Sequence, residues 1–268
     1  YYHDDIVILD MLPDCDIVIN LAAETHVDNS IENSQEFIRT NIEGVRNLLD
    51  LIRKKPDNVV HKPLFYHFST DEVYGDRSET GDPATEEDEL NPSNPYAASK
   101  AAADLLIKSY HRTYGIQYCI VRPANNYGTH QHPEKLIPLV VKLIKWGKKV
   151  RLHDGGKPLR AWLNVNDTVE ALITLIENDA TGIFNLGGRD RQTNYETVKQ
   201  IFLSSGMKES EMKEAWLDLS YKRAGQDMDY LISSEKMKNF YGWGPTRVFS
   251  QELPRIVSWY ANNEEWLF

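Results

Sequence analysis

The first part of this chain alternates short apolar runs with long amphipathic ones, and that alternation constrains the fold more than any other feature. The short runs at 16–23, 64–69 and 116–121 have the length and apolar character of buried parallel strands. Between them, residues 36–54 and 95–114 repeat apolar side chains at helical spacing. Strand, helix, strand, helix, strand is the order of a parallel sheet with crossover helices. We therefore predict an α/β fold with a doubly wound parallel sheet.

In the second part of the chain the pattern becomes mixed, which predicts a second, smaller α/β lobe. The predicted elements are helices over 133–147, 168–177 (with Asp167 as its N-cap) and 252–262, and strands over 150–153, 162–165 and 182–186. The run 162–165 is expected to return to the main sheet. We expect the sheet lobe to comprise residues 1–123 and 158–188, and the second lobe to comprise residues 124–157 and 189–268.

Composition narrows the classes of function and partner. The 268 residues hold 40 Asp and Glu against 30 Lys and Arg, a formal net charge of −10, whereas nucleic-acid binders usually carry a basic surplus. No run approaches the ~20 apolar residues of a membrane span, and no signal peptide opens the chain. The two cysteines suggest neither a disulfide framework nor a zinc motif. We expect a cytoplasmic protein with neither a nucleic-acid partner nor a membrane partner.

Tyr96 and Lys100 lie four residues apart, on one face of the helix predicted over 95–114. A free tyrosine has a pKa near ~10, too high for a base at neutral pH, and a nearby ammonium lowers that pKa. The pair is therefore suited to taking a proton from an alcohol while a hydride leaves. The alternative is a half-buried tyrosine beside a solvated lysine.

A second polar segment, residues 69–75, directly follows the strand predicted over 64–69. Open parallel sheets place their ligands at the carboxyl ends of strands. The adjacent carboxyls Asp71 and Glu72 can play opposite roles if their surroundings separate their pKa values, one donating a proton and the other accepting one. The alternative is a polar turn with a helix cap.

Together, residues 69–75 (Ser-Thr-Asp-Glu-Val-Tyr-Gly) and 95–102 (Pro-Tyr-Ala-Ala-Ser-Lys-Ala-Ala) resemble the dTDP-glucose 4,6-dehydratase family of the extended short-chain dehydrogenase/reductases. The resemblance runs from about Asp4 to Trp266, with further matches at 21–28, 125–128, 133–138 and 242–243. It implies a Rossmann-like sheet that binds NAD, a substrate-binding second lobe and a homodimer formed by the two long helices. It also implies a lyase that converts dTDP-glucose to dTDP-4-keto-6-deoxyglucose.

The resemblance implies a role for each polar residue of the two segments. Tyr96 matches the base that takes the C4 hydroxyl proton, Lys100 lowers its pKa and holds the nicotinamide ribose, and Thr70 hydrogen-bonds near that hydroxyl. Glu72 matches the base that removes the C5 proton of the 4-ketone, and Asp71 the acid that protonates the departing C6 hydroxyl. Hydride then returns to C6, so that NAD is regenerated in each turnover.

Other residues are assigned by the resemblance alone. The cofactor-binding residues that it implies are Ala22, Ala23, Thr40, Ser69, Tyr96 and Lys100, and the substrate-binding residues are Thr70, Asn125, Glu134, Lys135, Arg160 and Arg223. Arg160 suits a phosphate because a guanidinium binds it bidentately, and the alternative for it is a surface salt bridge. Gln226 stands where the family has His and Met228 where an Arg is usual, so the chain departs from the family at the nucleotide end. His130 and His132 are not assigned to a metal, because no third ligand is suggested.

The start of the chain also departs from the family. A doubly wound nucleotide-binding sheet normally opens with a strand and a Gly-rich turn, and this chain opens at residues 1–5 with no GxGxxG nearby. We expect a first βαβ unit to be missing, as in a fragment, because residues 4–21 still have the pattern of a sheet segment. A complete chain without that turn would bind NAD badly. Two alternatives stay open: an epimerase or decarboxylase on the same scaffold, against which residues 70–72 argue, and a catalytically silent sugar-nucleotide-binding protein.

Overall fold

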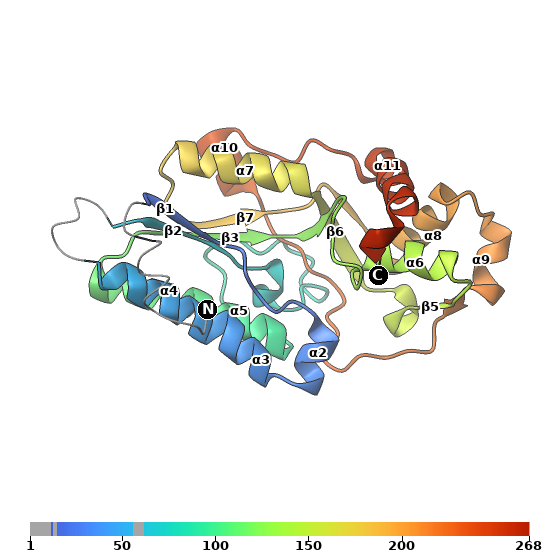
Figure 1. Cartoon of the computed structure of the whole chain (residues 1–268), viewed down its shortest axis with the longest axis horizontal. Helices are drawn as coiled ribbons and strands as arrows, with labels where there is room; N and C mark the ends of the chain where they lie inside the picture. The colour runs from blue at the N-terminus through green and yellow to red at the C-terminus, as the bar shows by residue number, and fades with distance from the viewer. Residues whose placement is uncertain (1–11, 13–14, 56–61, 268) are drawn as a thin grey trace.

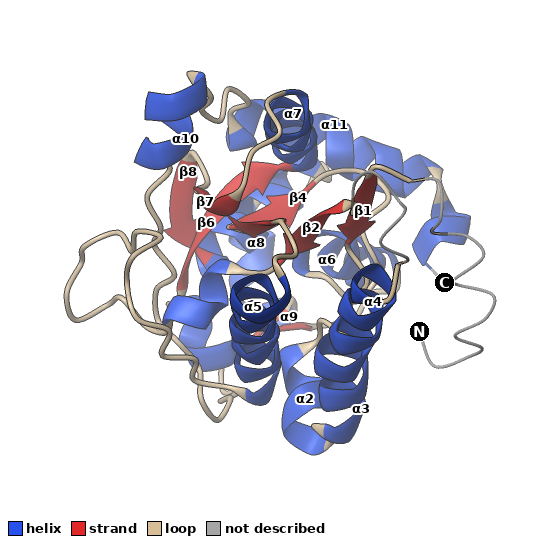
Figure 2. Cartoon of the chain, turned by 90° about the vertical axis from the view of Figure 1, so that its left-hand side faces the viewer, coloured by secondary structure: helices blue, strands red, loops and turns tan. Residues whose placement is uncertain are grey.

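The computed structural model describes residues 12, 15–55 and 62–267, and a parallel sheet lies at its centre (Figure 1). The strands lie in the order β1, β2, β3, β7, with bounds Ile17–Asn20, Leu64–Phe68, Tyr118–Pro123 and Gly182–Leu186. Helices α4 (Gly44–Arg53) and α5 (Pro95–Tyr114) cover one face, and α7 (Val165–Glu177) and α10 (Glu235–Tyr241) cover the other (Figure 1; Figure 2). The predicted α/β fold with a Rossmann-like doubly wound sheet is confirmed. The prediction made for residues 1–5 falls outside the described residues.

The helix predicted over 36–54 is present but irregular. It consists of α3 (Gln35–Phe37), a π-helical segment (Ile38–Glu43) and α4. Within the π-helical segment, the buried Asn41 amide donates to Ser99 Oγ at 2.8 Å, and its oxygen accepts from the Glu24 backbone N–H at 2.9 Å. Asn41 therefore ties the loop that follows β1 to helix α5. A π-helical turn of this kind is often found beside a functional site.

Helix α5 begins and ends where the sequence predicts. Asn94 caps it, because its side-chain oxygen accepts from the Ala97 N–H at 2.9 Å, and Pro95 occupies the first turn. Gly115 ends it with a left-handed φ of 71°, which glycine adopts without a steric penalty. The cap fixes the first turn of α5, which carries Tyr96, at the carboxyl end of the sheet.

A second group of elements packs beside the central sheet. Strands β4 (Asn125–Tyr127), β6 (Leu159–Asn164) and β8 (Asp190–Thr193) form a separate sheet, and β5 (Val150–Arg151) pairs with β9 (Leu217–Asp218). The helices are α6 (Leu136–Lys145), α8 (Asn194–Ser204), α9 (Glu209–Ala215) and α11 (Phe249–Asn262), and a short α2 (Val27–Glu32) follows β1. The expected return of residues 162–165 to the main sheet is wrong, since Trp162 pairs with Asn125 on one side and Asp190 on the other.

The expected cap of helix α7 is also wrong. The helix begins at Val165, and its cap is Asn164, whose side-chain oxygen accepts from the Asn166 N–H at 3.0 Å. Asp167 lies buried in the first turn, where it forms an ion pair with Arg247. An Asn three residues earlier therefore takes the capping position, and the carboxylate instead anchors the segment that leads into α11.

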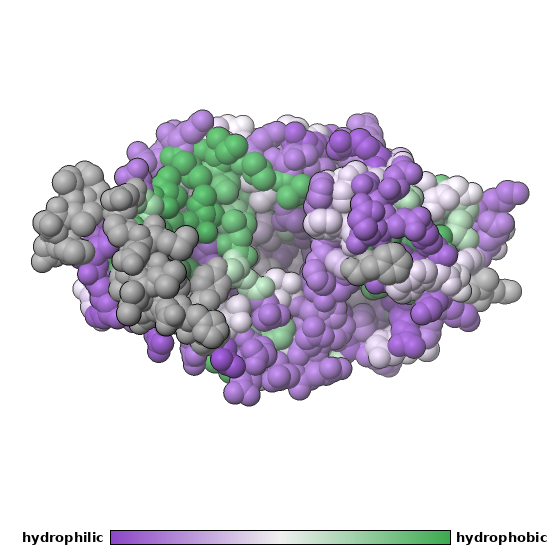
Figure 3. All heavy atoms as spheres, in the orientation of Figure 1, coloured by the Kyte–Doolittle hydropathy of each residue, from purple (hydrophilic) through white to green (hydrophobic). Residues whose placement is uncertain are grey.

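One surface of the molecule is strongly apolar. Apolar side chains of β1, of the residue that follows it and of α7 are exposed: Ile19, Leu21, Val165, Val169 and Ile173 (Figure 3). Strand β1 is the outermost strand of the sheet as far as the described residues extend. Among those residues, no helix combines the length and the apolar composition that crossing a bilayer requires.

Candidate active site

The two polar segments meet at the carboxyl ends of β1, β2 and β3, where two adjoining cavities of about 410 and about 200 Å³ open. Both cavities are lined by Glu72, Asn125 and Lys135. The larger is also lined by Ala23, Ser69, Thr70, Asp71, Tyr96 and Lys100, and the smaller by Glu134, Arg160 and Arg223. The sheet topology therefore brings together residues from six separate parts of the sequence.

Asp71 is held at the floor of the larger cavity. It opens a short 3₁₀ turn, Asp71–Tyr74, directly after β2, and only 3% of its surface is exposed. Burial, and then the adjacent Glu72 carboxyl, raise the pKa of Asp71 to about 7. Thr70 Oγ1 donates to its Oδ1 at 3.3 Å, while its buried Oδ2 has no hydrogen-bond partner among the described residues. Asp71 is therefore a carboxylic acid that keeps its proton close to neutral pH and has one oxygen left to present to a ligand.

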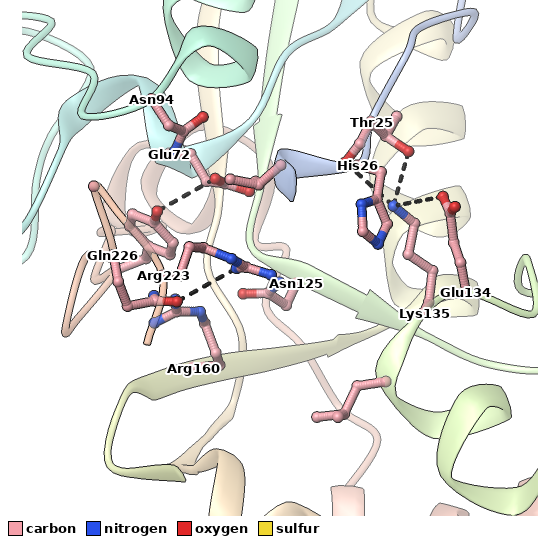
Figure 4. Close-up of a pocket in the computed structure, with 14 residues that line it drawn as sticks. Thr25, His26, Glu72, Asn94, Asn125, Glu134, Lys135, Arg160, Arg223 and Gln226 are labelled. Atoms are coloured by element: carbon pink, nitrogen blue, oxygen red, sulfur yellow. Dashed lines mark hydrogen bonds and ion pairs between the residues drawn. The ribbon is translucent and has the colours of Figure 1, made fainter. Parts of the chain in front are cut away.

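Glu72 faces both cavities from the next position. Loss of water raises its pKa as well, but the Arg160 guanidinium and hydrogen bonds with Tyr230 and Asn94 oppose that rise. Tyr230 donates to Glu72 Oε2 at 3.3 Å, and Asn94 lies beside the carboxylate (Figure 4). The two neighbouring carboxyls therefore sit in different surroundings, as an acid and a base in one reaction require.

Tyr96 lies in the first turn of α5 and is buried beside the carboxyl pair. Burial, and then the Glu72 charge, raise the pKa of Tyr96, while a hydrogen bond with Thr70 opposes the rise. The predicted lowering of the Tyr96 pKa by Lys100 is therefore wrong in this structure. The physical reason is that burial disfavours the charged phenolate most, and the Glu72 carboxyl adds to that effect.

Lys100 lines the larger cavity, although only 2% of it is exposed. Its Nζ donates to the Phe68 carbonyl at 2.6 Å and lies 3.4 Å from His67 Nε2. Burial lowers the pKa of Lys100 to about 8, and Asp104 opposes that change. The lysine shares a helix face with Tyr96 as predicted, but in this structure its ammonium is bound to strand β2.

Arg160, on β6, is the buried cation of the smaller cavity. Its guanidinium carbon lies 4.3 Å from the centre of the Tyr230 ring, and its Nη2 donates to the Asp227 carbonyl at 3.2 Å. It is 8% exposed, which excludes the alternative of a surface salt bridge. A desolvated guanidinium that is partnered by backbone carbonyls keeps its charge for an anionic ligand.

Arg223 is already engaged at the rim of the smaller cavity (Figure 4). Its Nε and Nη2 donate to the two oxygens of Asp28 at 2.6 and 2.8 Å, and its Nη1 donates to Gln226 Oε1 at 3.3 Å. On the other side of the cavity, Lys135 Nζ donates to Thr25 Oγ1 at 2.8 Å and lies 3.5 Å from Glu134 Oε1 (Figure 4). Gln226, where the family has His, therefore orients an arginine of the site.

Most of the residues singled out by the sequence lie at these cavities. Ala22 and Thr40 are the exceptions: within the described part of the chain they line neither cavity, and Thr40 lies in the π-helical segment. Lining residues that sequence reasoning missed include Thr25, His26, Asn94, Gln131, Trp162 and Tyr230. Asn94 carried a signal, since Asn before Pro marks a helix start, whereas nothing local marks Tyr230.

Comparison with known proteins places the chain among sugar-nucleotide enzymes. A family model described as GDP-mannose 4,6 dehydratase matches residues 7–256. The dTDP-glucose 4,6-dehydratase of Xanthomonas campestris pv. campestris is 39% identical over 261 residues, which are 94% of this chain and 74% of that protein. The dTDP-glucose 4,6-dehydratase of Escherichia coli is 36% identical over 270 residues, 94% of this chain and 75% of that protein.

Solved structures give the same result. The crystal structure of DesIV, a dTDP-glucose 4,6-dehydratase from Streptomyces venezuelae with NAD bound, matches with a TM-score of 0.90 and 34% identity. The match covers 98% of this chain and 78% of that one. A UDP-glucuronic acid 4-epimerase from Bacillus cereus, at 22% identity and a TM-score of 0.86 over 97% of this chain and 80% of that one, shares the fold.

Proposed function

Since this chain belongs to the family of GDP-mannose and dTDP-glucose 4,6-dehydratases, we propose that it is a hydro-lyase that dehydrates a nucleoside-diphosphate hexose with NAD. Its substrate is dTDP-glucose and its product dTDP-4-keto-6-deoxyglucose. The observation that carries the proposal is the Asp71–Glu72 pair, placed beside Tyr96 in one cavity and given two different environments. A same-fold epimerase needs no such acid–base pair for elimination across C5 and C6.

The larger cavity fits a dinucleotide cofactor by its position and its donors. It lies at the carboxyl ends of parallel strands, where small Ala23 leaves room, Ser69 lines the wall and the Lys100 ammonium offers a polar hydrogen. The predicted holding residues are these three with Tyr96, Ala22 and Thr40. When bound, NAD supplies the hydride acceptor for C4, the hydride donor for C6 and a positive charge.

Tyr96 accepts the C4 hydroxyl proton in this proposal. Because burial and Glu72 raise its pKa, the phenolate needs a cation nearby, and Lys100 on the same helix face is the cation that the chain offers. Thr70, whose hydrogen bond with Tyr96 opposes that rise, holds the hydroxyl in line. As Tyr96 takes the proton from the C4 hydroxyl oxygen, the hydride on C4 would pass to bound NAD, which would leave a 4-ketone.

Glu72 and Asp71 then complete the elimination. The ketone acidifies the C5 hydrogen, Glu72 removes that proton, and Asp71 gives its own proton to the C6 hydroxyl, which departs as water. Asp71 has a proton to give, since its pKa of about 7 leaves it partly protonated at neutral pH. Hydride delivered to C6 and a proton returned to C5 give the 4-keto-6-deoxy sugar.

In this proposal the smaller cavity binds the nucleoside-diphosphate part of the substrate. Arg160 and Arg223 are its cations for the diphosphate, and Asn125, Glu134 and Lys135 are the remaining predicted contacts. Because Asp28 holds Arg223 bidentately, a phosphate that binds there must share or displace that carboxylate.

Four further properties stay predictions. The chain is divided into a cofactor lobe of residues 1–123 and 158–188 and a substrate lobe of residues 124–157 and 189–268. It forms a homodimer through its long helices, it works in the cytoplasm, and nucleic acid and membrane are not its partners. In support of the dimer, α4 and α5 lie side by side on the outside of the sheet (Figure 2), and Leu105 on α5 is 55% exposed.

The test is incubation of the protein, with and without NAD, with dTDP-glucose, UDP-glucose and GDP-mannose in parallel. We expect the alkali-induced absorbance of a 4-keto-6-deoxy sugar, and a mass loss of one water, with dTDP-glucose. A signal with UDP-glucose or GDP-mannose but not with dTDP-glucose would change the assigned substrate and support the assigned reaction. Folded protein that gives no signal with any of them would favour a catalytically silent binding protein.

A further inference from the structure

A buried polar cluster lies directly beneath the floor of the larger cavity, and the steps above do not use it. Its members are Asn20 on β1, His67 on β2, Asp104 on α5 and Arg122 on β3, each between 0 and 3% exposed. Buried polar and charged groups are costly unless they are paired, so a cluster of this size implies a purpose for its contacts.

His67 links the outermost described strand to the catalytic helix. Its Nδ1 lies 3.0 Å from the side-chain amide nitrogen Nδ2 of Asn20, its Nε2 lies 3.4 Å from Lys100 Nζ, and its ring stacks on Phe65. Nε2 also faces Asp104 Oδ1, but at 4.0 Å that separation is too long for a hydrogen bond. Lys100 is thus the hydrogen-bond partner of Nε2.

The charges around the ring fix its protonation state. Lys100 approaches Nε2 from α5, and Arg122 on β3 donates from Nε and Nη2 to Asp104 Oδ2, both at 2.9 Å. Ser69 Oγ also donates to Asp104 Oδ2, at 3.0 Å, so Asp104 balances the arginine rather than the imidazole. Burial, and then the Lys100 charge, hold the pKa of His67 well below its usual range, so the ring is neutral. A neutral imidazole has one nitrogen that donates and one that accepts.

We propose that His67 is a positioning residue for Lys100: its neutral ring accepts a hydrogen bond from the ammonium at Nε2 and, with the Phe68 carbonyl, holds the amine at the cavity floor. Nδ1 then carries the proton and donates to the Asn20 side-chain oxygen. This requires the Asn20 amide to be turned by 180°, so that its oxygen and its nitrogen exchange places. The role in turnover rests on the proposed dehydratase function, whereas the contact itself does not.

The proposal predicts a definite tautomer in the unmodified protein. The ¹⁵N spectrum of His67, assigned by its loss in His67→Gln, should show a protonated Nδ1 and an unprotonated Nε2 at neutral pH. A protonated Nε2 would overturn the proposal, because that nitrogen could not accept from an ammonium.

Two substitutions separate the two ends of the ring. In His67→Gln the amide oxygen reaches about as far as Nε2 and keeps an acceptor for Lys100, while in His67→Asn the shorter amide serves Asn20 and leaves Lys100 without its acceptor. The pKa of Lys100 can be read from the ¹³Cε resonance of labelled lysine, assigned by its loss in Lys100→Met. Loss of a hydrogen-bond acceptor from an ammonium favours the neutral amine. We therefore expect His67→Asn to lower the Lys100 pKa by about one unit, and His67→Gln to leave it at about 8.

Tyr66→Phe is the matched control. Tyr66 precedes His67 on β2, is equally buried, and donates to the Leu175 carbonyl on the opposite face of the sheet. It should leave the Lys100 titration unchanged. An unchanged titration in His67→Asn would overturn the proposal, and the tautomer measurement decides the matter should that variant fail to fold.

Dehydration assays then give a separate readout. If the dehydratase proposal holds, the alkaline limb of the rate profile set by Lys100 should move toward lower pH in His67→Asn and not in His67→Gln. If the protein dehydrates no sugar at all, the two NMR measurements still decide whether His67 holds Lys100, so the two proposals fail independently.

Discussion

At the scale of single residues, the site depends on the adjacent carboxyls of Asp71 and Glu72, whose surroundings differ. Asp71 is buried with one oxygen that has no hydrogen-bond partner among the described residues, whereas Glu72 accepts a hydrogen bond from Tyr230. The Arg160 charge lowers the pKa of both carboxyls. The residue types and their order were readable from the sequence. Their different surroundings were not, because these depend on Tyr230, which lies far along the chain.

The raised pKa of Asp71 has a measurable effect on stability. Folding raises its pKa from 3.8 to about 7, so between those values the folded state binds more protons and loses stability as pH rises. Asp71→Asn removes that loss, and we expect it to raise the Tm more at pH 8 than at pH 4 in calorimetric scans. An equal change at both pH values would contradict the assignment.

Asp28→Asn provides a control of opposite sign. Burial tends to raise the pKa of Asp28, but the hydrogen bonds and charge of Arg223 outweigh it and lower that pKa on folding. The stability that Asp28 contributes is therefore present above its unfolded pKa and is lost as pH falls through its folded pKa. This substitution should lower the Tm more near neutral pH than at pH 3.

Tyr96 shows what sequence reasoning misses at this scale. The spacing of Tyr96 and Lys100 predicted a shared helix face correctly and a lowered tyrosine pKa wrongly. Neither the burial of Tyr96 nor the approach of Glu72 to its hydroxyl is encoded in a four-residue spacing, because Glu72 comes from another element.

At the scale of elements, helix ends decide where the catalytic groups stand. Helix α5 was predictable at both ends, since Asn-Pro and Gly mark them, and its cap places Tyr96. The π-helical segment and the second sheet were not predictable, because each depends on distant partners: Asn41 on Ser99, and β6 on β4 and β8. A short apolar run such as 162–165 does not specify which sheet it joins.

The caps of α5 and α8 provide a matched pair of substitutions. Asn94→Ala and Thr193→Ala each remove a side-chain acceptor at a helix start, at 2.9 and 3.1 Å from its backbone N–H. Each should cost about 1 kcal/mol of unfolding free energy in urea titrations. Only Asn94→Ala should also lower dehydration, because Asn94 contacts Glu72 and anchors the turn that carries Tyr96. Equal activity in both variants would show that the α5 cap is only structural.

At the scale of the whole molecule, the central sheet and its two helical layers followed from the alternating pattern of strands and helices. The placement of the second group of elements against the carboxyl ends of the strands creates the cavities, and it followed from the family resemblance rather than from the residues. The ion pair of Asp28 with Arg223 joins helix α2 to a segment 195 residues away, so no local signal could reveal it.

The predicted homodimer can be tested on the outer face of α5. Leu105 is 55% exposed there, and a charge at its position should prevent two apolar helix faces from pairing. We expect light scattering at micromolar concentration to give a dimer for the unmodified protein and a monomer for Leu105→Glu. Phe240→Glu, at a 71% exposed position on α10 across the sheet, should leave the dimer intact. A monomeric unmodified protein would refute this prediction.

The most direct test of the proposed chemistry is one turnover of dTDP-glucose by Glu72→Gln, compared with the unmodified protein. Because Glu72 acts only after C4 has been oxidised, the variant should accumulate the NADH absorbance while the sugar loses no water. The unmodified protein should show no lasting NADH and a product lighter by one water. Dehydration that continues in Glu72→Gln at the unmodified rate would contradict the assignment of Glu72 as the base and, with it, the division of labour between the two carboxyls.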